Sequence, residues 1–196
     1  MSAGLVVAAL AAARGWEPTV AAAAATGASE QAPLGNDEAA AGRAGEQLER
    51  LHAIHNYSRR YHISEELSTA IYDIAHSEGI DPALAFPLVR LESQFKETAT
   101  SPVGAIGLAQ VMLPTARGYV PDITRDQLYD RDTNLMIGFR HLRGLLRQYR
   151  GNIELALLVY NRGGVAVELD RELGIDPSNG YDRIVMKGYR GKGTID

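Results

Sequence analysis

The feature that most constrains the fold is a succession of segments in which apolar residues recur at helical spacing, with no segment of any length that alternates with a period of two. Recurrence at i, i+3, i+4 and i+7 marks one face of a helix, whereas alternation marks a half-buried strand. We expect longer helices over residues 46–60, 65–78, 82–95, 133–150, 153–160, 165–173 and 181–189, and shorter ones over 108–112, 115–119 and 124–128. The sequence predicts an all-α domain, and the absence of an internal repeat argues against a helical solenoid.

The helix expected over residues 82–95 has clear boundary signals. Asp81 is a favourable N-cap, and Pro82 occupies the first helical position, where its missing N–H group costs nothing. Pro87 falls inside this helix and removes one backbone hydrogen bond, so we expect a bend there. The apolar residues that should face a core are Leu84, Leu88, Leu91 and Phe95.

Glu92 lies four residues after Leu88 and therefore borders this apolar face. Desolvation disfavours the charged form of a carboxyl group, so Glu92 is a candidate acid with a raised pKa. A solvated Glu is the alternative, and spacing alone favours it because charged residues are mostly exposed. The loop that follows favours a site: small residues such as Ser101 and Gly104 let backbone approach a ligand, and Gln110 offers an amide.

The composition excludes several kinds of site. A formal net charge of −4 gives no strong basic field, so we expect no nucleic-acid partner. The chain has no Cys, which excludes disulfides, thiol nucleophiles and Cys-based zinc sites. His52 and His55 could form a metal pair on adjacent helical turns, with His62 nearby, but no acidic or thiol ligand is spaced to complete it. We expect a monomer without a metal or cofactor.

Residues 1–45 differ in composition from the rest: 17 of them are Ala, and Gly, Ser, Thr and Pro fill much of the remainder. We expect a flexible, disordered tether. Within it, the apolar run of residues 5–13 suits the hydrophobic region of a secretory signal and is shorter than the roughly 20 residues that span a bilayer. No Lys or Arg precedes the run, so Ala-rich low complexity is the alternative.

Three ordered blocks resemble the soluble lytic transglycosylase (SLT) domain, glycoside hydrolase family 23. Residues 92–95 (Glu-Ser-Gln-Phe) are similar to the family's Glu-Ser pair. Residues 101–110 (Ser-Pro-Val-Gly-Ala-Ile-Gly-Leu-Ala-Gln) resemble its Ser-x-x-Gly-Ala-x-Gly-Leu-Met-Gln block, and residues 114–116 (Pro-Thr-Ala) its following turn. Residues 156–163 (Ala-Leu-Leu-Val-Tyr-Asn-Arg-Gly) resemble its Ala-Tyr-Asn-Ala-Gly element. The resemblance covers roughly residues 65–190.

The resemblance implies a lysozyme-like helical domain with a cleft. We expect a signal-like, low-complexity segment over residues 1–45, a leading helix over 46–63, a catalytic domain over 64–190 and a tail over 191–196. An exported protein of the periplasm or cell envelope follows from the same resemblance.

The resemblance also implies cleavage of the β-1,4 bond between N-acetylmuramic acid and N-acetylglucosamine in peptidoglycan glycan strands. Glu92 would protonate the leaving oxygen and then take a proton from the muramyl C6 hydroxyl, which closes a 1,6-anhydro ring. Ordinary glycosidases need two carboxylates. The nearest second one here is Glu97, which we expect to be solvated.

Five further residues match family positions in the saccharide groove or near the catalytic region. Ser101 matches the loop Ser, with a turn Ser as the alternative. Gln110 matches a groove Gln. Tyr160 matches a Tyr whose hydroxyl reaches the catalytic region, with a half-buried core Tyr as the alternative. Asn161 is expected to brace the turn more than to touch substrate, and Tyr181 resembles a later Tyr before the last helix.

Three departures from the family pattern leave other readings open. Ala109 replaces Met and so removes a soft side chain from the groove. Arg162 replaces a small residue and either pairs with a stem-peptide or muramyl carboxylate or narrows the groove. Pro87 replaces an aliphatic residue. The alternatives are a muramidase-type hydrolase on the same fold, a non-catalytic peptidoglycan-binding domain, and a helical interaction module.

Overall fold

The computed structural model describes residues 34–195. The chain divides into two units, Met1–Ala41 and Gly42–Asp196, and the second unit holds every element below except the first turns of the first helix. The signal-like run expected at residues 5–13 lies outside the described residues. No helix in the described part is both long and apolar enough to cross a membrane.

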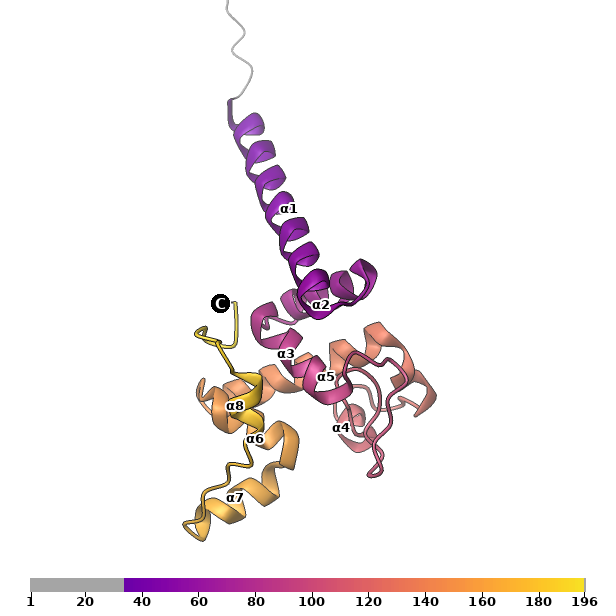
Figure 1. Cartoon of the computed structure of the whole chain (residues 1–196), viewed down its shortest axis with the longest axis vertical. Helices are drawn as coiled ribbons and strands as arrows, with labels where there is room; N and C mark the ends of the chain where they lie inside the picture. Colours follow the sequence, from indigo (N-terminus) through magenta and orange to yellow (C-terminus); the bar gives the residue numbers. More distant parts are fainter. Residues whose placement is uncertain (1–33, 196) are drawn as a thin grey trace, which may run out of the picture. The chain divides into compact units, whose positions relative to one another are not determined.

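The described part of the chain is helical and contains isolated bridges but no strand, which confirms the all-α prediction. The elements are α1 (Leu34–Tyr61), α2 (Glu65–Ser77), α3 (Pro82–Ser93), α4 (Leu113–Arg117), the 3₁₀ helix η1 (Asp126–Tyr129), α5 (Arg131–Gln148), α6 (Ile153–Arg162), α7 (Gly164–Glu172) and α8 (Tyr181–Val185). Figure 1 shows the irregular segment that follows α3 on one side of that helix and α6, α7 and α8 on the other.

Helix α1 corrects the expected boundary of the N-terminal segment. It begins at Leu34, so residues 34–45, which we expected to be part of a flexible tether, are helical. Four of these twelve residues are Ala, the strongest helix former, and this preference outweighs Gly35, Gly42 and Gly45, each of which costs about 1 kcal/mol in a helix. The prediction from composition alone therefore made the flexible N-terminal segment too long.

The cap signals placed most helix starts correctly. Ser64, Asp81 and Asn152 each accept a backbone N–H bond from the first turn of the helix that follows. Helix α5 begins one or two residues earlier than expected, because Asp130 provides the cap. Helix α3 runs through Pro87 but ends at Ser93 instead of residue 95.

The segment between α3 and α5 departs most from expectation. The helix expected over residues 108–112 is absent; Ile106 and Val111 instead exchange both backbone hydrogen bonds across a tight turn, at 3.1 and 2.9 Å. Gly107 and Gln110 have φ values of 75° and 46°, in the left-handed region that ends a helix. The short helix that follows, α4, begins two residues before its expected start at 115.

Two hydrophobic clusters form the core of the second unit. The main one joins α2, α3, α5, α6 and α8, and α1 packs on it through Tyr57, whose ring stacks on Phe86 with centroids 4.0 Å apart. The smaller one lies under the irregular segment around Ile106, Leu128 and Ile137. Leu91, which we expected in the core, is 36% exposed and lines a surface cavity.

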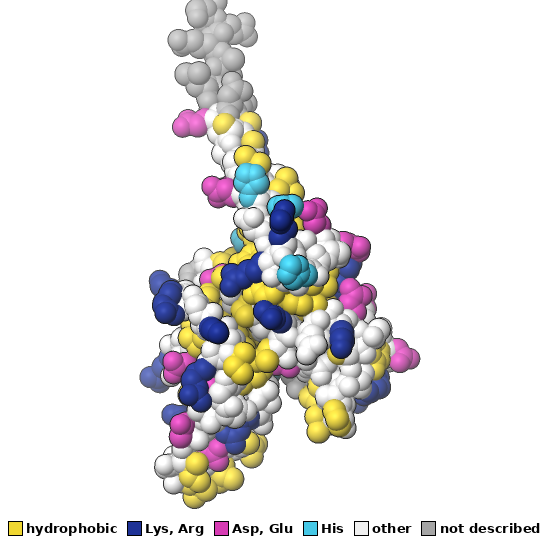
Figure 2. All heavy atoms as spheres, in the orientation of Figure 1, with side chains coloured by type: hydrophobic (Ala, Val, Ile, Leu, Met, Phe, Trp, Pro, Cys, Tyr) yellow, Lys and Arg dark blue, Asp and Glu magenta, His cyan; other side chains and the backbone are white. Residues whose placement is uncertain are grey.

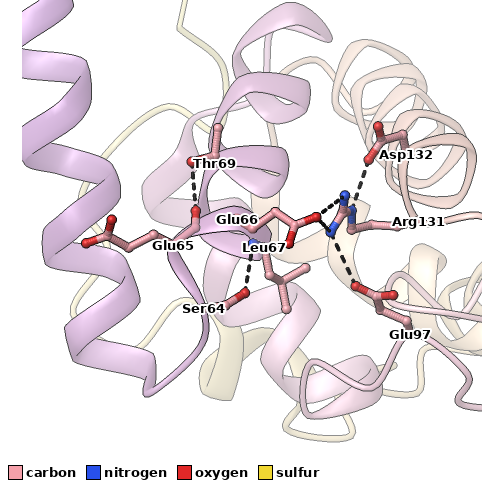
Figure 3. Close-up of polar contacts among 8 residues, drawn as sticks. All are labelled: Ser64, Glu65, Glu66, Leu67, Thr69, Glu97, Arg131 and Asp132. Carbon is pink, nitrogen blue, oxygen red and sulfur yellow. Dashed lines mark hydrogen bonds and ion pairs between the residues drawn. The ribbon is translucent and has the colours of Figure 1, made fainter.

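Arg131 ties the start of α5 to two other parts of the fold (Figure 3). Its guanidinium bonds Glu66 on α2 at 3.1 Å and lies 3.6 Å from Glu97 in the segment after α3. Asp132 accepts a third contact at 3.2 Å. This cluster fixes one side of the segment that carries the expected site residues.

Candidate active site

Glu92 occupies the last turn of α3, one turn after the buried core residues Leu88 and Val89. Its side chain is half-buried, and Oε1 accepts a hydrogen bond from the hydroxyl of Tyr181, the first residue of α8. The carboxyl therefore lies at the contact between α3 and α8, neither in bulk solvent nor in an ion pair among the described residues.

Burial raises the pKa of Glu92, and the hydrogen bond from Tyr181 opposes part of that rise. Burial and the nearby carboxylate also raise the pKa of Tyr181 well above its usual range, so this hydroxyl stays a donor at any working pH. Since Tyr181 occupies Oε1, Oε2 remains to carry a proton. The arrangement gives a neutral carboxyl that can donate a proton at a higher pH than an ordinary Glu.

Tyr181 is positioned by a chain of amide contacts. Asn161, at the end of α6, accepts a bond from Asn179 at 2.8 Å, and Asn179 in turn accepts the backbone N–H of Tyr181 at 3.1 Å. Asn161 thus braces the turn before α8, the role expected over direct substrate contact. Its substrate contact stays a prediction.

Tyr160 connects α6 to the loop block. Its hydroxyl donates to the carbonyl of Ala109 at 2.8 Å, and burial, together with the nearby Glu92 carboxylate, raises its pKa well above the usual range. The residue therefore lies close to the carboxyl, but its hydrogen bond is structural. Ala109 is fully buried, and its Cβ faces Gly138 on α5, so the Ala side chain itself does not line a groove.

The loop block places Ser101 and Gln110 in structural hydrogen bonds. The Ser101 hydroxyl accepts the backbone N–H of Ala105 at 3.0 Å, as the turn reading predicted. The Gln110 amide nitrogen donates to the carbonyl of Gly107 at 2.9 Å. In the described residues the Gln110 carbonyl oxygen has no hydrogen-bond partner, so it can still accept from a ligand.

Asn134, which sequence reasoning missed, holds this block against α5. It is buried, its Oδ1 accepts the N–H of Ala109 at 2.8 Å, and its Nδ2 donates to the carbonyls of Ile106 and Leu128 at 2.8 and 2.9 Å. Asn is a weak helix former, so an Asn among apolar residues of a helix was the available signal. Gly107 allows the close approach, because a Cβ there would lie 2.3 Å from Nδ2.

Arg162 does not present its charge to a ligand. One terminal nitrogen donates to the carbonyl of Pro177 at 2.5 Å and the other pairs with Asp170 at 2.7 Å. The expected pairing with a stem-peptide or muramyl carboxylate is therefore wrong, because intramolecular partners already occupy the guanidinium. The side chain instead fixes the segment before α8.

Glu97 is exposed and pairs with Arg131 (Figure 3), so it contacts solvent, as expected, but also has a cationic partner.

Among residues 34–195 no group of three His, Asp or Glu side chains could hold a metal ion. A cavity of about 800 Å³ is lined by Pro87, Arg90 and Leu91 on α3, and Glu92 is not among its lining residues.

Known proteins resemble this chain in sequence and in fold. Residues 54–173 match the family model described as the transglycosylase SLT domain. The soluble lytic murein transglycosylase of Salmonella typhimurium is 32% identical over 112 residues, covering 52% of this chain, and that of Escherichia coli K12 is 30% identical. A transglycosylase of Enterobacteria phage PRD1 is 37% identical over 84 residues, covering 43% of this chain and 30% of its own length.

Among solved structures, an inactive Glu-to-Gln mutant of the lytic transglycosylase Slt of Pseudomonas aeruginosa superposes with a TM-score of 0.50 at 27% identity. The match covers 59% of this chain and 21% of that one. The chain spans only 17% of the length of the enterobacterial relatives, so the likeness is to one domain of longer proteins.

Proposed function

The chain belongs to the transglycosylase SLT domain family, and from that premise we propose that it is a lytic transglycosylase of peptidoglycan. It cleaves the β-1,4 bond between N-acetylmuramic acid and N-acetylglucosamine. The observation that carries the proposal is the half-buried carboxyl of Glu92, whose pKa burial raises and whose Oε1 the Tyr181 hydroxyl holds. The relatives' description as murein transglycosylases supports the substrate class.

In the first step Glu92 acts as a general acid. Its proton moves to the glycosidic oxygen, the bond from that oxygen to the muramyl C1 breaks, and the electron pair leaves with the oxygen of N-acetylglucosamine. The acetamido carbonyl of the muramyl residue stabilises the positive charge that develops at C1. Glu92 is now a carboxylate, which the Tyr181 hydroxyl stabilises.

In the second step the same carboxylate acts as a general base. It takes the proton of the muramyl C6 hydroxyl while that oxygen bonds to C1, which closes the 1,6-anhydro ring and returns Glu92 to its neutral form. No water is consumed. One carboxyl with a pKa near the working pH suffices for both transfers, so the mechanism does not need Glu97, which pairs with Arg131.

The substrate places the protein in the cell envelope, and we propose that the full chain is exported. Fractionation of cells that express the full-length protein tests this: recovery with the envelope or periplasm supports it, and recovery with the cytosol contradicts it.

Digestion of purified sacculi tests the activity. Mass spectrometry should detect 1,6-anhydromuramyl products with wild type and with the control variant Glu97→Gln, and none with Glu92→Gln. Release of muramic acid reducing ends would instead indicate a muramidase. Retention of the protein on sacculi without any loss of turbidity would indicate a binding domain.

A further inference from the structure

The last segment of the described chain is strongly basic. Residues 183–195 contain four Lys or Arg residues and no Asp or Glu, in a chain whose net charge is −4. The four side chains, all exposed, are those of Arg183, Lys187, Arg190 and Lys192. The segment is held on the fold by Tyr189, whose hydroxyl donates to Asp81 at 2.8 Å and accepts the N–H of Gly193 at 2.7 Å. Its charges therefore have a defined position on the surface.

Two cavities, one on each side of this segment, collect further cations. The first has a volume of about 250 Å³, and its cationic lining residues are Arg60, Lys187 and Arg190. The second has a volume of about 280 Å³ and lies at the end of α5, where its cations include Arg147, Arg150 and Lys192. The basic segment thus joins cations from α1 and α5 into one surface, which we call the basic face.

The six cations of the basic face have no carboxylate partner. Among the described residues no Asp or Glu lines the second cavity, and none of the six cations makes an ion pair. The one carboxylate of the first cavity, Asp81, already accepts the N–H of Ala83 and the hydroxyl of Tyr189. Unpaired cations elsewhere lie beside acidic residues in the sequence, as in Lys96-Glu97 and Arg125-Asp126. The basic face is therefore a local excess of positive charge, suited to an anionic partner.

Apolar side chains lie within the basic face. The cavity of about 800 Å³ shares Arg60 and Lys187 with the first cavity and is also lined by Tyr61, Leu91 and Ile184. Ile184 is 59% exposed and Leu91 36%. Figure 2 shows Lys, Arg and His side chains around an apolar area below the end of α1. Cations that surround aliphatic and aromatic side chains are typical of surfaces that rest on a bilayer, where the apolar groups enter the headgroup boundary.

The basic face points away from the candidate active site. Arg90 lines the same cavity, and it lies two positions before Glu92 on α3. Positions two apart point to nearly opposite sides of an α-helix. A partner that covers the basic face therefore leaves the carboxyl of Glu92 on the other side of α3.

We propose that the basic face docks the protein on an anionic lipid bilayer. The Arg and Lys side chains bind the lipid phosphates, and Leu91 and Ile184 enter the headgroup boundary. The charge selects an anionic partner, and the exposed apolar residues among the cations select a bilayer over a soluble polyanion. Salt screens exposed charges, so the docking weakens as ionic strength rises.

Sedimentation with lipid vesicles tests the proposal without any measurement on glycan. The full chain should bind phosphatidylglycerol vesicles more tightly than phosphatidylcholine vesicles, and the difference should shrink as salt is added. The variant Lys187→Gln/Arg190→Gln/Lys192→Gln should lose about a hundredfold in affinity for phosphatidylglycerol vesicles. Residues 1–45 are the same in every variant, so the apolar run there cannot cause a difference between variants.

The matched control removes the same charge from three exposed positions between α3 and α5: Lys96→Gln/Arg117→Gln/Arg125→Gln. It should keep the affinity of wild type. Equal affinity of wild type for the two kinds of vesicle would overturn the proposal, as would an unchanged affinity in the first variant or an equal loss in the control.

A second variant separates a bilayer from a soluble polyanion. Ile184→Gln, at an exposed position, should weaken binding to phosphatidylglycerol vesicles and leave binding to inorganic polyphosphate unchanged. Unchanged vesicle binding in Ile184→Gln, or tighter binding of wild type to polyphosphate than to vesicles at equal phosphate concentration, would overturn the proposal in favour of a soluble polyanion.

Discussion

The hydroxyl of Tyr181 donates a hydrogen bond to Oε1 of Glu92, across 89 positions of the chain. The bond joins the last turn of α3 to the first residue of α8 and stabilises the carboxylate form, whereas burial stabilises the neutral form. Burial outweighs the hydrogen bond, so the pKa of Glu92 lies above its usual value, which is the direction that favours a general acid.

Tyr181→Phe should shift the pH dependence of activity. Glu92 must be protonated to start the reaction, so the rate falls as the pH rises through its pKa. The Tyr181 hydrogen bond lowers that pKa, and its removal should raise it and move the alkaline limb of kcat/KM to higher pH. The control Tyr72→Phe, on α2, should leave the limb in place. A limb that stays fixed or moves to lower pH in Tyr181→Phe contradicts this role.

Glu92→Gln should make the protein more stable near neutral pH. The pKa of Glu92 is higher in the folded state than in the unfolded one, so the folded state loses stability as the pH rises through the folded pKa. Gln does not titrate and avoids this loss. Urea unfolding should show a gain over wild type at neutral pH that shrinks below pH ~4, where Glu92 becomes protonated in both the folded and the unfolded state. A variant less stable than wild type at neutral pH would show that the carboxylate stabilises the fold.

Gly138→Ala should destabilise the contact between α5 and the loop block. A Cβ at this position would lie 2.5 Å from the Cβ of Ala109 and 3.1 Å from the hydroxyl of Tyr160. Overpacking of this kind costs about 1–3 kcal/mol. Gly144→Ala on the same helix meets only an ordinary contact of 3.4 Å and should gain up to about 1 kcal/mol from helix propensity. Thermal unfolding compares the Tm values of the two variants with that of wild type. Equal changes in Tm for Gly138→Ala and Gly144→Ala would contradict the packing argument.

Asn134→Ala should cost on the order of 3 kcal/mol, because it removes three buried hydrogen bonds and leaves the N–H of Ala109 and the carbonyl of Leu128 without the side-chain partner, while the carbonyl of Ile106 keeps its bond from Val111. Activity should fall as well, since the loop block loses its brace. Asn56→Ala, an exposed position on α1, should change the free energy of unfolding by less than about 0.5 kcal/mol. A similar small change at Asn134 would show that the loop block holds its position without it.

Helices that begin with a side-chain cap could be predicted from the sequence. Ser64, Asp81 and Asn152 are local signals, because each binds a backbone group within its own first turn. The irregular segment could not be predicted in the same way. It turns at Gln94 and Gln110, which have left-handed backbone angles that an L residue rarely adopts without tertiary support.

The candidate site also has a part that could be predicted from the sequence and a part that could not. Glu92 could be found from its place on an apolar helix, and the family resemblance supplied the positions of Tyr160 and Tyr181. The partners of these residues could not be found, because Tyr181 reaches Glu92 across 89 positions and Asn134 reaches Ala109 across 25. Arg162 shows the converse: a charge expected to face a ligand is bound by Asp170 on the next helix.

The central claim is that the muramyl C6 hydroxyl, activated by Glu92, takes the place of water at C1. Digestion of sacculi in ¹⁸O-labelled water, followed by mass spectrometry of the released muropeptides, tests it most directly. The account predicts 1,6-anhydromuramyl ends without label from wild type, and no products from Glu92→Gln. Reducing muramic acid ends that carry ¹⁸O would contradict it.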